Sequence, residues 1–373
     1  MEVCQGNMLK VCHFTSVHDA KDRRIFSKEC CSLAKLGFKV FIVAPNAVSE
    51  IIHDVQIIGV PVANDNRLYR IFFYTKLIFQ KALELNADIY HFHDPELLSV
   101  GLKLKKKGKK VIFDSHEDVP QQILNKTYIP KPFRFLISRI YAKYESRIVA
   151  KLDATISVND SIAEKLKKSN IHSVVIANYP EIIPSGNSGI RKENYICFAG
   201  AITENYLHHR VIEVINGIED IRYSLAGPCH NKYLEKLKQH PGWKKVDYYG
   251  VLPYIEVLHL YQKAKIGIAI HDYTPNVGGK EGSLGILKNF EFMAAGFPII
   301  CTDFRVWKKI IEEEECGICV APYDSEGLAS AIRYLLDNPE IATRMGENGR
   351  KAVLEKYCWS SEEKKLVTLY NSL

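Results

Sequence analysis

Short apolar segments alternate with longer amphipathic stretches along the chain. The segments are rich in Val, Ile, Phe and Tyr, and their apolar residues run continuously rather than at every second position. Continuous apolarity is typical of strands covered on both faces, and amphipathic stretches between such strands indicate parallel βαβ units. We therefore predict strands over 9–14, 40–44, 55–60, 89–92, 111–113, 155–158 and 174–177, and then over 195–199, 223–226, 246–249, 266–270, 298–301 and 318–320.

A segment rich in proline, glycine and small polar residues separates the two series of strands. It runs from Pro180 to Gly189 and has the composition of a linker. Each series predicts a Rossmann-like, doubly wound parallel sheet, and 373 residues suit two domains. We expect an N-terminal domain over 1–185 and a C-terminal domain over 190–357, with the two domains facing a cleft.

The composition is that of an ordinary globular enzyme, with 47% hydrophobic and 25% charged residues. No apolar run reaches the roughly 18 residues of a membrane-spanning helix. The first residues lack the basic start and apolar stretch of a signal peptide. We expect a cytoplasmic protein, with the inner face of the cell membrane as an alternative location.

The ten cysteines are scattered, and several lie inside apolar segments. This pattern favours reduced core residues over a disulfide framework. Cys316 and Cys319 form one C-x-x-C, but no second pair and no histidines at ligand spacing follow. We therefore expect no metal site.

Positive charge concentrates in the first half of the chain, although the net charge is only +7. Residues 101–151 hold 13 Lys and Arg against 4 Asp and Glu. A basic face favours an anionic partner, such as a phosphate-bearing substrate, a lipid surface or nucleic acid. The alternative is a solvated surface without a partner.

Open α/β sheets bind ligands outside the carboxyl ends of their strands. The first strand is followed by His18, Asp22 and Arg24, which are candidates for substrate contact. Asp22 could equally cap a helix. No G-x-G-x-x-G is present there, so dinucleotide binding is not expected.

Two further strands of the first half end in ionisable residues. His91 and His93 share one face of an extended chain, but no third ligand is evident, which favours a polar strand end over a metal site. The strand over 111–113 leads to His116 and Glu117. His116 is placed to hydrogen-bond a sugar hydroxyl or a phosphate, and a structural histidine is the alternative.

The second half carries a glycine-rich loop directly before a helix. The loop contains Gly278, Gly279, Gly282 and Gly285, and the helix ends at Gly296-Phe297-Pro298. Exposed backbone N–H groups and the positive end of a helix dipole form an anion site suited to a diphosphate. Lys288 adds a point charge, and Glu291 follows within reach of a ribose.

The chain has no D-x-D, the aspartate pair by which many sugar transferases hold a divalent ion against a diphosphate. Charge neutralisation is therefore expected from the helix end and basic side chains rather than from a metal ion.

At these residues the chain resembles the large family 4 of glycosyltransferases (glycosyl transferases group 1), which has the two-domain GT-B fold. The segments that carry the resemblance are 22–29 with Gly37 and 40–45, then 93–98 with 114–118, and 288–298. Together they extend over essentially the whole chain, and the last is the most specific.

The resemblance implies a nucleotide-sugar held by residues 195–350, with Glu291 on the ribose and His116 on the transferred sugar. Similar enzymes use no metal or other cofactor and usually retain the anomeric configuration. They often build bacterial surface polysaccharides such as capsule, O-antigen or exopolysaccharide. The final helix of such folds commonly returns to the first domain, which here would be 358–373.

Two departures from the family pattern affect the expected site. The family often has two glutamates with seven residues between them; here Ser283 stands eight residues before Glu291, in place of the first glutamate, and Glu281, ten residues before, is the candidate to replace it in catalysis. The family also often has Arg and Lys shortly after the residue matching Gly200. Both are absent, so Arg210 and Lys288 are the candidates for holding the diphosphate. The expected donor-binding set is Glu291, Lys288, Gly279, Ser283, Gly285, Gly200 and Arg210, and the acceptor-side set is His18, Asp22, Arg24, His93 and Glu117.

We expect transfer of a hexose from a nucleotide diphosphate-sugar to a lipid-linked or oligosaccharide acceptor, with peripheral membrane contact through the basic residues 101–151 and no nucleic-acid partner. One alternative is another nucleotide-sugar enzyme on the same fold, an epimerase or phosphorylase. Another is a non-catalytic module that binds polyanions or lipid, which would leave the 278–296 segment unexplained.

Overall fold

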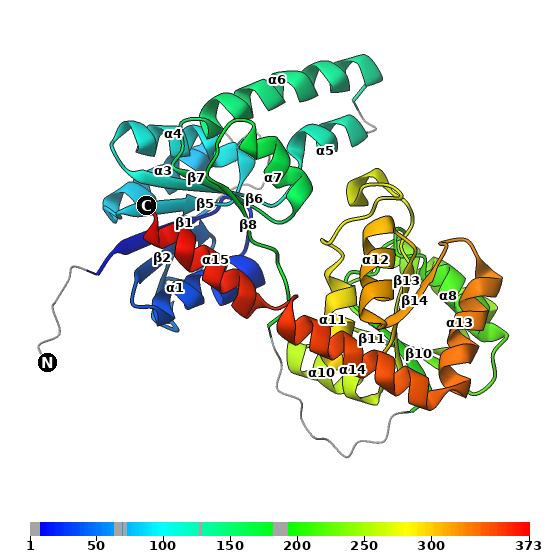
Figure 1. Ribbon diagram of the computed structural model, residues 1–373. Helices are drawn as coiled ribbons and strands as arrows, with labels where there is room; N and C mark the ends of the chain where they lie inside the picture. The colour runs from blue at the N-terminus through cyan, green and yellow to red at the C-terminus, as the bar shows by residue number, and fades with distance from the viewer. Residues whose placement is uncertain (1–7, 63–68, 70–72, 127–128, 182–192) are drawn as a thin grey trace, which may run out of the picture. The chain divides into compact units, whose positions relative to one another are not determined.

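A computed structural model describes residues 8–62, 69, 73–126, 129–181 and 193–373. The chain divides into two compact units, which Figure 1 shows in ribbon form. Unit 1 comprises Met1–Asn178 with Ser360–Leu373, and unit 2 comprises Tyr179–Trp359. Most of the expected linker lies outside the described residues.

Unit 1 contains an eight-stranded sheet in the order β3-β4-β2-β1-β5-β6-β7-β8. All neighbours are parallel except β3 and β4. The strands are β1 (Lys10–Phe14), β2 (Lys39–Pro45), β3 (Glu50–Ile52), β4 (Val55–Val60), β5 (Ile89–Phe92), β6 (Lys110–Ser115), β7 (Ala154–Ser157) and β8 (Ser173–Val175). Seven of them lie where the apolar segments predicted strands.

The short strand β3 was not predicted, and it makes the edge of the sheet antiparallel. His53 and Asp54 both have positive φ, 49° and 62°, and form a tight two-residue connection to β4. β3 has only three residues, and Ile51 points into solvent. It therefore lacks the continuous apolarity that marks a strand covered on both faces.

Helices cover both faces of this sheet (Figure 1). They are the π-helix η1 (Arg23–Cys30), α1 (Cys31–Lys35), α3 (Thr75–Glu84), the 3-10 helix η3 (Pro95–Leu97), α4 (Leu98–Lys106), α5 (Val119–Asn125), α6 (Lys131–Val149), α7 (Asp160–Lys167) and α15 (Trp359–Asn371). In α15, Glu362 Oε2 accepts a hydrogen bond of 2.8 Å from the backbone N–H of Ala177.

Alternation along β1 and β5 gives the two faces of the sheet different characters. Cys12, Phe14, Tyr90 and Phe92 point into an apolar core that also contains buried residues of α3 and α4. The intervening positions of these strands therefore point to the other face, where several buried polar side chains lie. This polar face positions the groups described below.

Unit 2 contains a six-stranded, wholly parallel sheet in the order β11-β10-β9-β12-β13-β14. Its strands are β9 (Tyr195–Ala199), β10 (Arg222–Ala226), β11 (Val246–Gly250), β12 (Ile266–Ala269), β13 (Ile299–Thr302) and β14 (Gly317–Val320). All six lie where the sequence predicted them, to within two residues at each end. The predicted class of two doubly wound α/β sheets is therefore confirmed.

The helices of unit 2 are α8 (His208–Asn216), α9 (Asn231–Lys238), the 3-10 helix η4 (Pro241–Lys245), α10 (Tyr254–Lys263), the 3-10 helix η5 (Pro275–Val277), α11 (Leu287–Ala295), α12 (Arg305–Glu314), α13 (Ser325–Asp337) and α14 (Pro339–Glu355). Among the described residues of the chain, no helix combines the length and apolarity needed to cross a bilayer.

Gly267 lets two aromatic rings pack directly against the centre of the unit 2 sheet. A Cβ at this position of β12 would lie 2.4 Å from Phe292 Cγ and 2.5 Å from Phe297 Cε2. Both rings are buried, so neither can move aside into solvent. The absence of a side chain at Gly267 therefore sets how closely α11 approaches the sheet.

Replacing Gly267 with Ala should lower the free energy of unfolding of unit 2 by about 1–3 kcal/mol, the usual cost of overpacking a buried site. The three tryptophans of the chain all lie in unit 2, so their fluorescence during urea unfolding reports on this unit. Gly217→Ala is the control, since its Cβ would meet only Val214 O at 3.7 Å. Equal stability of the two variants would contradict this packing account.

Candidate functional site

The buried guanidinium of Arg24 anchors the polar face of unit 1. Arg24 lies in η1, and its Nε and Nη2 donate to Asp114 Oδ2 and Oδ1, both at 3.1 Å. Its Nη1 donates to the carbonyl of Ile176 at 2.9 Å. Both charged groups are almost completely buried. A bidentate contact of this kind requires a specific geometry. Removing one partner would leave the other charge buried and unpaired.

Asp114 in turn orients two histidines. His116 Nε2 lies 3.0 Å from Asp114 Oδ2, and His93 Nδ1 lies 3.4 Å from the same oxygen. Burial alone would raise the pKa of Asp114, but Arg24 and then His116 outweigh it and hold that pKa well below its usual range. A carboxylate that stays ionised fixes which nitrogen of each imidazole carries the proton.

His18 and His116 meet at the partly exposed edge of this network. Their ring centroids are 5.1 Å apart, and His18 Nε2 lies 3.4 Å from Asp94 Oδ1. Asp94 is buried and also accepts from the Thr15 hydroxyl and the Ser16 backbone N–H, both at 2.6 Å. Two carboxylate-backed imidazoles thus lie side by side where β1, β5 and β6 end.

The predicted acceptor-side residues and the predicted catalytic His116 therefore take different positions. His18 and His116 are partly exposed, whereas Arg24 and His93 are buried and support their neighbours. Asp22 is the N-cap of η1, because its Oδ1 accepts from the backbone N–H groups of Arg24 and Ile25. This is the capping role that the sequence left open. Glu117 is exposed and accepts from Gln122.

A second group of residues lies in unit 2, where two glycines follow the carboxyl ends of β9 and β10 and Lys288 lies close to one of them. A Cβ on Gly200 would lie 2.6 Å from Lys288 Cε, and one on Gly227 would lie 1.8 Å from the carbonyl oxygen of Gly200. Gly200 thus leaves room for the Lys288 stem to run over its backbone, and Gly227 allows the end of β10 to approach the backbone of Gly200. Gly227 also has a φ of +135°, which favours glycine.

Glu291 lies one turn after Lys288 in α11 and is paired with it. Lys288 Nζ lies 2.7 Å from Glu291 Oε2, and the Tyr261 hydroxyl donates to the same oxygen at 3.2 Å. Both charged side chains keep some exposure, at 22% and 14%. Burial, followed by the charge of Glu291, raises the pKa of Tyr261, so this phenol stays a donor. One oxygen of the Glu291 carboxylate, Oε2, is thereby held in place.

The loop before α11 bends through three glycines with positive φ, namely Gly278, Gly279 and Gly282. No side chain caps the first turn of α11, and no acidic residue lies in that turn. The first N–H groups of a helix lack partners within it, and the dipole makes this end positive. The geometry therefore suits an anion beside Lys288.

Other predicted donor residues hold the loop or lie apart from Lys288. Ser283 Oγ accepts from the Gly285 N–H at 3.0 Å, and the Ser283 carbonyl accepts from Trp307 Nε1 at 3.0 Å. Glu281 is exposed and pairs with Arg305 at 3.0 Å. Arg210 bonds Ser325 Oγ at 3.4 Å and lies over the Tyr323 ring; among the described residues no bond joins it to Lys288 or Glu291.

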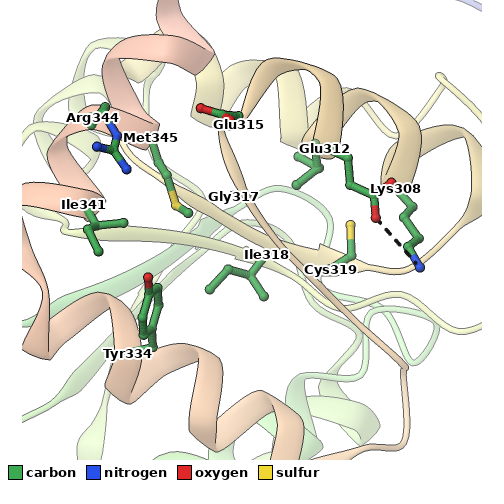
Figure 2. Close-up of a pocket in the computed structure, with 11 residues that line it drawn as sticks. Lys308, Glu312, Glu315, Gly317, Ile318, Cys319, Tyr334, Ile341, Arg344 and Met345 are labelled. Carbon is green, nitrogen blue, oxygen red and sulfur yellow. Dashed lines mark ion pairs between the residues drawn. The ribbon is translucent and has the colours of Figure 1, made fainter.

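A cavity of about 440 Å³ lies elsewhere in unit 2, between β14 and helices α12, α13 and α14 (Figure 2). Its walls include Ile318, Met345 and Tyr334, with the Lys308–Glu312 ion pair at its rim. It contains none of the predicted site residues.

Several residues of the unit 1 network could not be assigned from the sequence. Thr15 and Asp94 bond each other across 79 positions, and Arg24 reaches Asp114 across 90. The one signal was indirect, because polar residues inside or directly after an apolar strand need buried partners. Which partners meet depends on the strand order, which the sequence pattern does not give.

Two family comparisons match the two halves of the chain. Residues 29–179 match the family described as Glycosyltransferase Family 4, and residues 184–352 match Glycosyl transferases group 1. Among curated proteins, a phosphatidyl-myo-inositol mannosyltransferase of Mycobacterium leprae is 33% identical over 99 residues, which are 26% of this chain and 25% of that protein. That match thus spans about a quarter of the relative's length.

Solved structures share the fold at low sequence identity. Sucrose-phosphate synthase from Thermosynechococcus elongatus has a TM-score of 0.73 at 15% identity, with 98% of each chain covered. HepE of Anabaena, solved in complex with UDP and glucose, has a TM-score of 0.71 at 12% identity and covers 98% of this chain and 100% of its own. These likenesses define the class as GT-B. The chain belongs to the family 4 glycosyltransferases of group 1, as the resemblance in its motifs indicated.

His208, at the start of α8, gives unit 2 a specific pH dependence. It is buried, its Nδ1 lies 2.9 Å from the Tyr223 hydroxyl, and burial lowers its pKa to about 3. In the unfolded chain His208 takes up a proton near pH 6.5, whereas in the folded unit it stays neutral down to about pH 3. Stability from this group is complete above pH 6.5 and falls as the pH approaches 3.

Between pH 7 and pH 5 this single histidine should cost unit 2 about 2 kcal/mol of unfolding free energy. His208→Gln should remove that part of the pH dependence while lowering stability at pH 7. Urea unfolding followed by tryptophan fluorescence at both pH values measures the difference. An unchanged pH dependence in the variant would show that His208 is protonated in the folded unit.

Proposed function

We propose that the chain transfers a hexose from a nucleotide diphosphate-sugar to a hydroxyl of a lipid-linked or oligosaccharide acceptor. The observation that carries the proposal is the group at the start of α11, where Lys288 pairs with Glu291 and lies over the side-chain-free backbone of Gly200. A cation, exposed helix amides and a carboxylate are the groups that a diphosphate and a ribose require. The HepE structure, which holds UDP, supports the choice of ligand class.

In this proposal the diphosphate lies against the first turn of α11 and Lys288. Glu291 then accepts from the ribose hydroxyls, since Tyr261 and Lys288 already fix one of its oxygens. Charge that develops on the leaving diphosphate is stabilised by the helix end and the ammonium group, with no metal ion at the phosphates. Glu281 is the candidate residue for contacting the donor sugar. Its ion pair with Arg305 would have to break for that contact to form.

On the acceptor side, His116 binds the transferred sugar, and His18 contacts the acceptor. Asp114 and Asp94 orient these imidazoles through the contacts described above. In the transfer, the anomeric carbon exchanges its bond to the diphosphate oxygen for a bond to the acceptor oxygen. The nucleoside diphosphate leaves with the bonding electron pair and takes up the acceptor's proton. Retained anomeric configuration and a role in bacterial surface polysaccharides rest on the family resemblance.

A thermal-shift screen against UDP-, GDP- and ADP-sugars identifies the donor, because a true ligand raises the melting temperature. With that donor, Glu291→Gln should weaken binding by about 10- to 100-fold, the loss expected when charge-assisted hydrogen bonds worth about 1.5–3 kcal/mol are removed. Isothermal titration calorimetry measures the affinity directly.

Glu312→Gln is the control for this variant. Glu312 lies on α12 of the same unit and pairs with Lys308 at the surface, so its replacement should leave donor affinity unchanged. A folded Glu291→Gln protein with wild-type affinity would remove the ribose role and, with it, the main support for the proposal.

We also propose that unit 1 contacts an anionic membrane through α6. Phe133, Phe135, Leu136 and Ile140 each expose more than half of their surface, which is unusual for large apolar residues on one helix. The same helix carries Arg134, Arg139, Lys143 and Arg147. Apolar side chains with basic neighbours suit a helix that lies in a membrane interface.

The double variant Phe133→Glu with Ile140→Glu should lose binding to vesicles of phosphatidylglycerol and phosphatidylcholine. The new carboxylates oppose both the apolar insertion and the attraction to anionic lipid. Flotation of the vesicles on a density gradient measures the bound fraction. Ile171→Glu places the same charge on a side chain of unit 1 that is 84% exposed and remote in sequence from α6, and it should bind as wild type. Equal binding by all three proteins would contradict the assignment to α6.

A further inference from the structure

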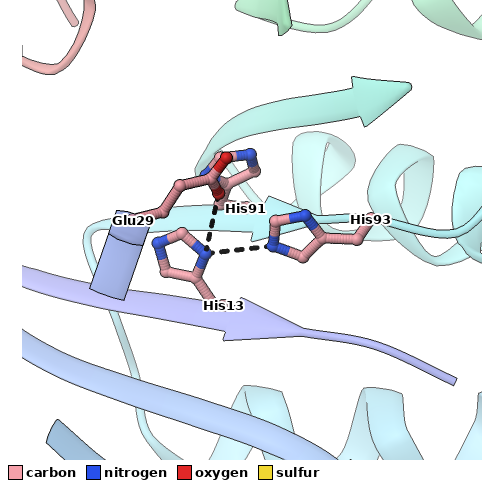
Figure 3. A group of neighbouring side chains, drawn as sticks. All are labelled: His13, Glu29, His91 and His93. Atoms are coloured by element: carbon pink, nitrogen blue, oxygen red, sulfur yellow. Dashed lines mark hydrogen bonds and ion pairs between the residues drawn. The ribbon is translucent and has the colours of Figure 1, made fainter. Parts of the chain in front are cut away.

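Four side chains of residue types that can bind a metal ion converge on the polar face of unit 1 (Figure 3). His13 comes from β1, His91 from the end of β5, His93 from just after it, and Glu29 from η1. One possible ligand atom of each lies within 4.8 Å of those of the others, and all four residues are buried. The register of the parallel strands places His13 directly beside His91, with ring centroids 4.4 Å apart.

Each of the three imidazoles has one ring nitrogen that points away from the centre of the cluster and has a partner there. These contacts fix the orientation of the rings. Tyr370 of α15 bonds His91 Nδ1 at 2.8 Å and His13 Nε2 at 3.2 Å. His93 Nδ1 faces Asp114 Oδ2 at 3.4 Å. A tyrosine oxygen has two lone pairs, so it can accept from both His13 and His91. Histidines that bind metals generally donate their other nitrogen to a carboxylate or similar acceptor.

The atoms that face the centre of the cluster have few hydrogen-bond partners. His91 Nε2 is buried and has no hydrogen-bond partner among the described residues. His93 Nε2 lies 3.0 Å from His13 Nδ1, which in turn lies 4.0 Å from Glu29 Oε2. The other carboxylate oxygen of Glu29, Oε1, lies 3.2 Å from Arg24 Nε, so Oε2 is the oxygen that faces His13.

We propose that these four residues bind one divalent transition-metal ion of the zinc class, through His13 Nδ1, His91 Nε2, His93 Nε2 and a carboxylate oxygen of Glu29. Three imidazole nitrogens and one carboxylate oxygen suit zinc in four-coordinate geometry. Ligands about 2.0–2.1 Å from a tetrahedral ion lie about 3.3 Å from each other. The separations of 3.0 and 4.0 Å bracket this value, and all four atoms lie within 4.8 Å of one another, so the side chains must draw closer together at some of these contacts to bind the ion.

The ion would be structural rather than catalytic. Four protein ligands close the coordination sphere, and catalytic zinc sites keep one position open for water or substrate. All four ligands are at most 2% exposed. The ion would join β1, β5 and η1, and through Tyr370 it would also hold α15 to the sheet. The neighbouring group of His93, Asp114 and His116 is less suited, because it offers only three ligands and both oxygens of Asp114 already accept from the Arg24 guanidinium.

His208 shows why an orphaned nitrogen alone does not define such a site. Its Nδ1 bonds a tyrosine hydroxyl and its buried Nε2 has no partner, as in His91. Among the described residues, however, it belongs to no group of three or more metal ligands. His208→Gln is therefore a matched control that removes a buried histidine of the same local geometry from unit 2.

The test uses the full chain without a histidine tag, produced with added zinc and dialysed against chelator-free buffer. Mass spectrometry of metal content should find close to one zinc per chain in the wild type and in His208→Gln. His91→Gln and Glu29→Gln should retain little of it. Adding EDTA to the wild type should lower its melting temperature by several degrees, since an ion that binds only the folded state stabilises it.

Replacing zinc with cobalt distinguishes metal bound at this site from metal bound by cysteines. Cys301 and Cys319 are the cysteines to exclude, because their Sγ atoms lie 3.8 Å apart. Co²⁺ bound by nitrogen and oxygen ligands gives tetrahedral visible bands without thiolate charge-transfer absorption, and this readout on the wild type does not depend on any variant folding. Wild-type protein without bound zinc, full retention in His91→Gln and Glu29→Gln, or a thiolate spectrum would each overturn the proposal.

Discussion

Strands that are covered on both faces can carry a polar side chain only where the strand ends or where another buried group satisfies it. This constraint shapes both units. In unit 2 the central strands β9 and β12 are apolar, and the charged pair of Lys288 and Glu291 lies on α11, with the Lys288 stem over Gly200 at the end of β9. In unit 1 polar residues enter the strands themselves, so a buried network must satisfy them. The two sets of polar groups are therefore consequences of burial and lie where a parallel sheet binds ligands.

The Arg24–Asp114 pair shows what the unit 1 network requires. Two buried charges are costly to desolvate, and the forked contact with its additional bond to Ile176 compensates for that cost. The ionised Asp114 then orients His116 at the partly exposed edge and His93 in the interior. A surface imidazole and the proposed metal cluster thus depend on the same carboxylate. Changes to Arg24 would disturb both, which makes it a positioning residue.

The sequence allowed the strands to be predicted because continuous apolar segments are a local signal. It missed β3, whose three residues carry no such signal. The pairing of Lys288 with Glu291 follows from helical spacing, whereas the approach of Lys288 to Gly200 depends on how α11 packs. The sequence also led us to expect no metal, since H-x-H at 91 and 93 lacked a third ligand. His13 and Glu29 supply the missing ligands, but only strand order and the course of η1 bring them there.

The central claim is that the amides opening α11, together with Lys288, hold the diphosphate of a nucleotide-sugar. A crystal structure with the donor identified by the thermal-shift screen tests it most directly. We predict that the diphosphate lies against the first turn of α11 beside Gly200 and that the ribose hydroxyls contact Glu291. A well-ordered donor bound elsewhere in unit 2, with the Lys288–Glu291 pair undisturbed and covering the helix end, would contradict the account.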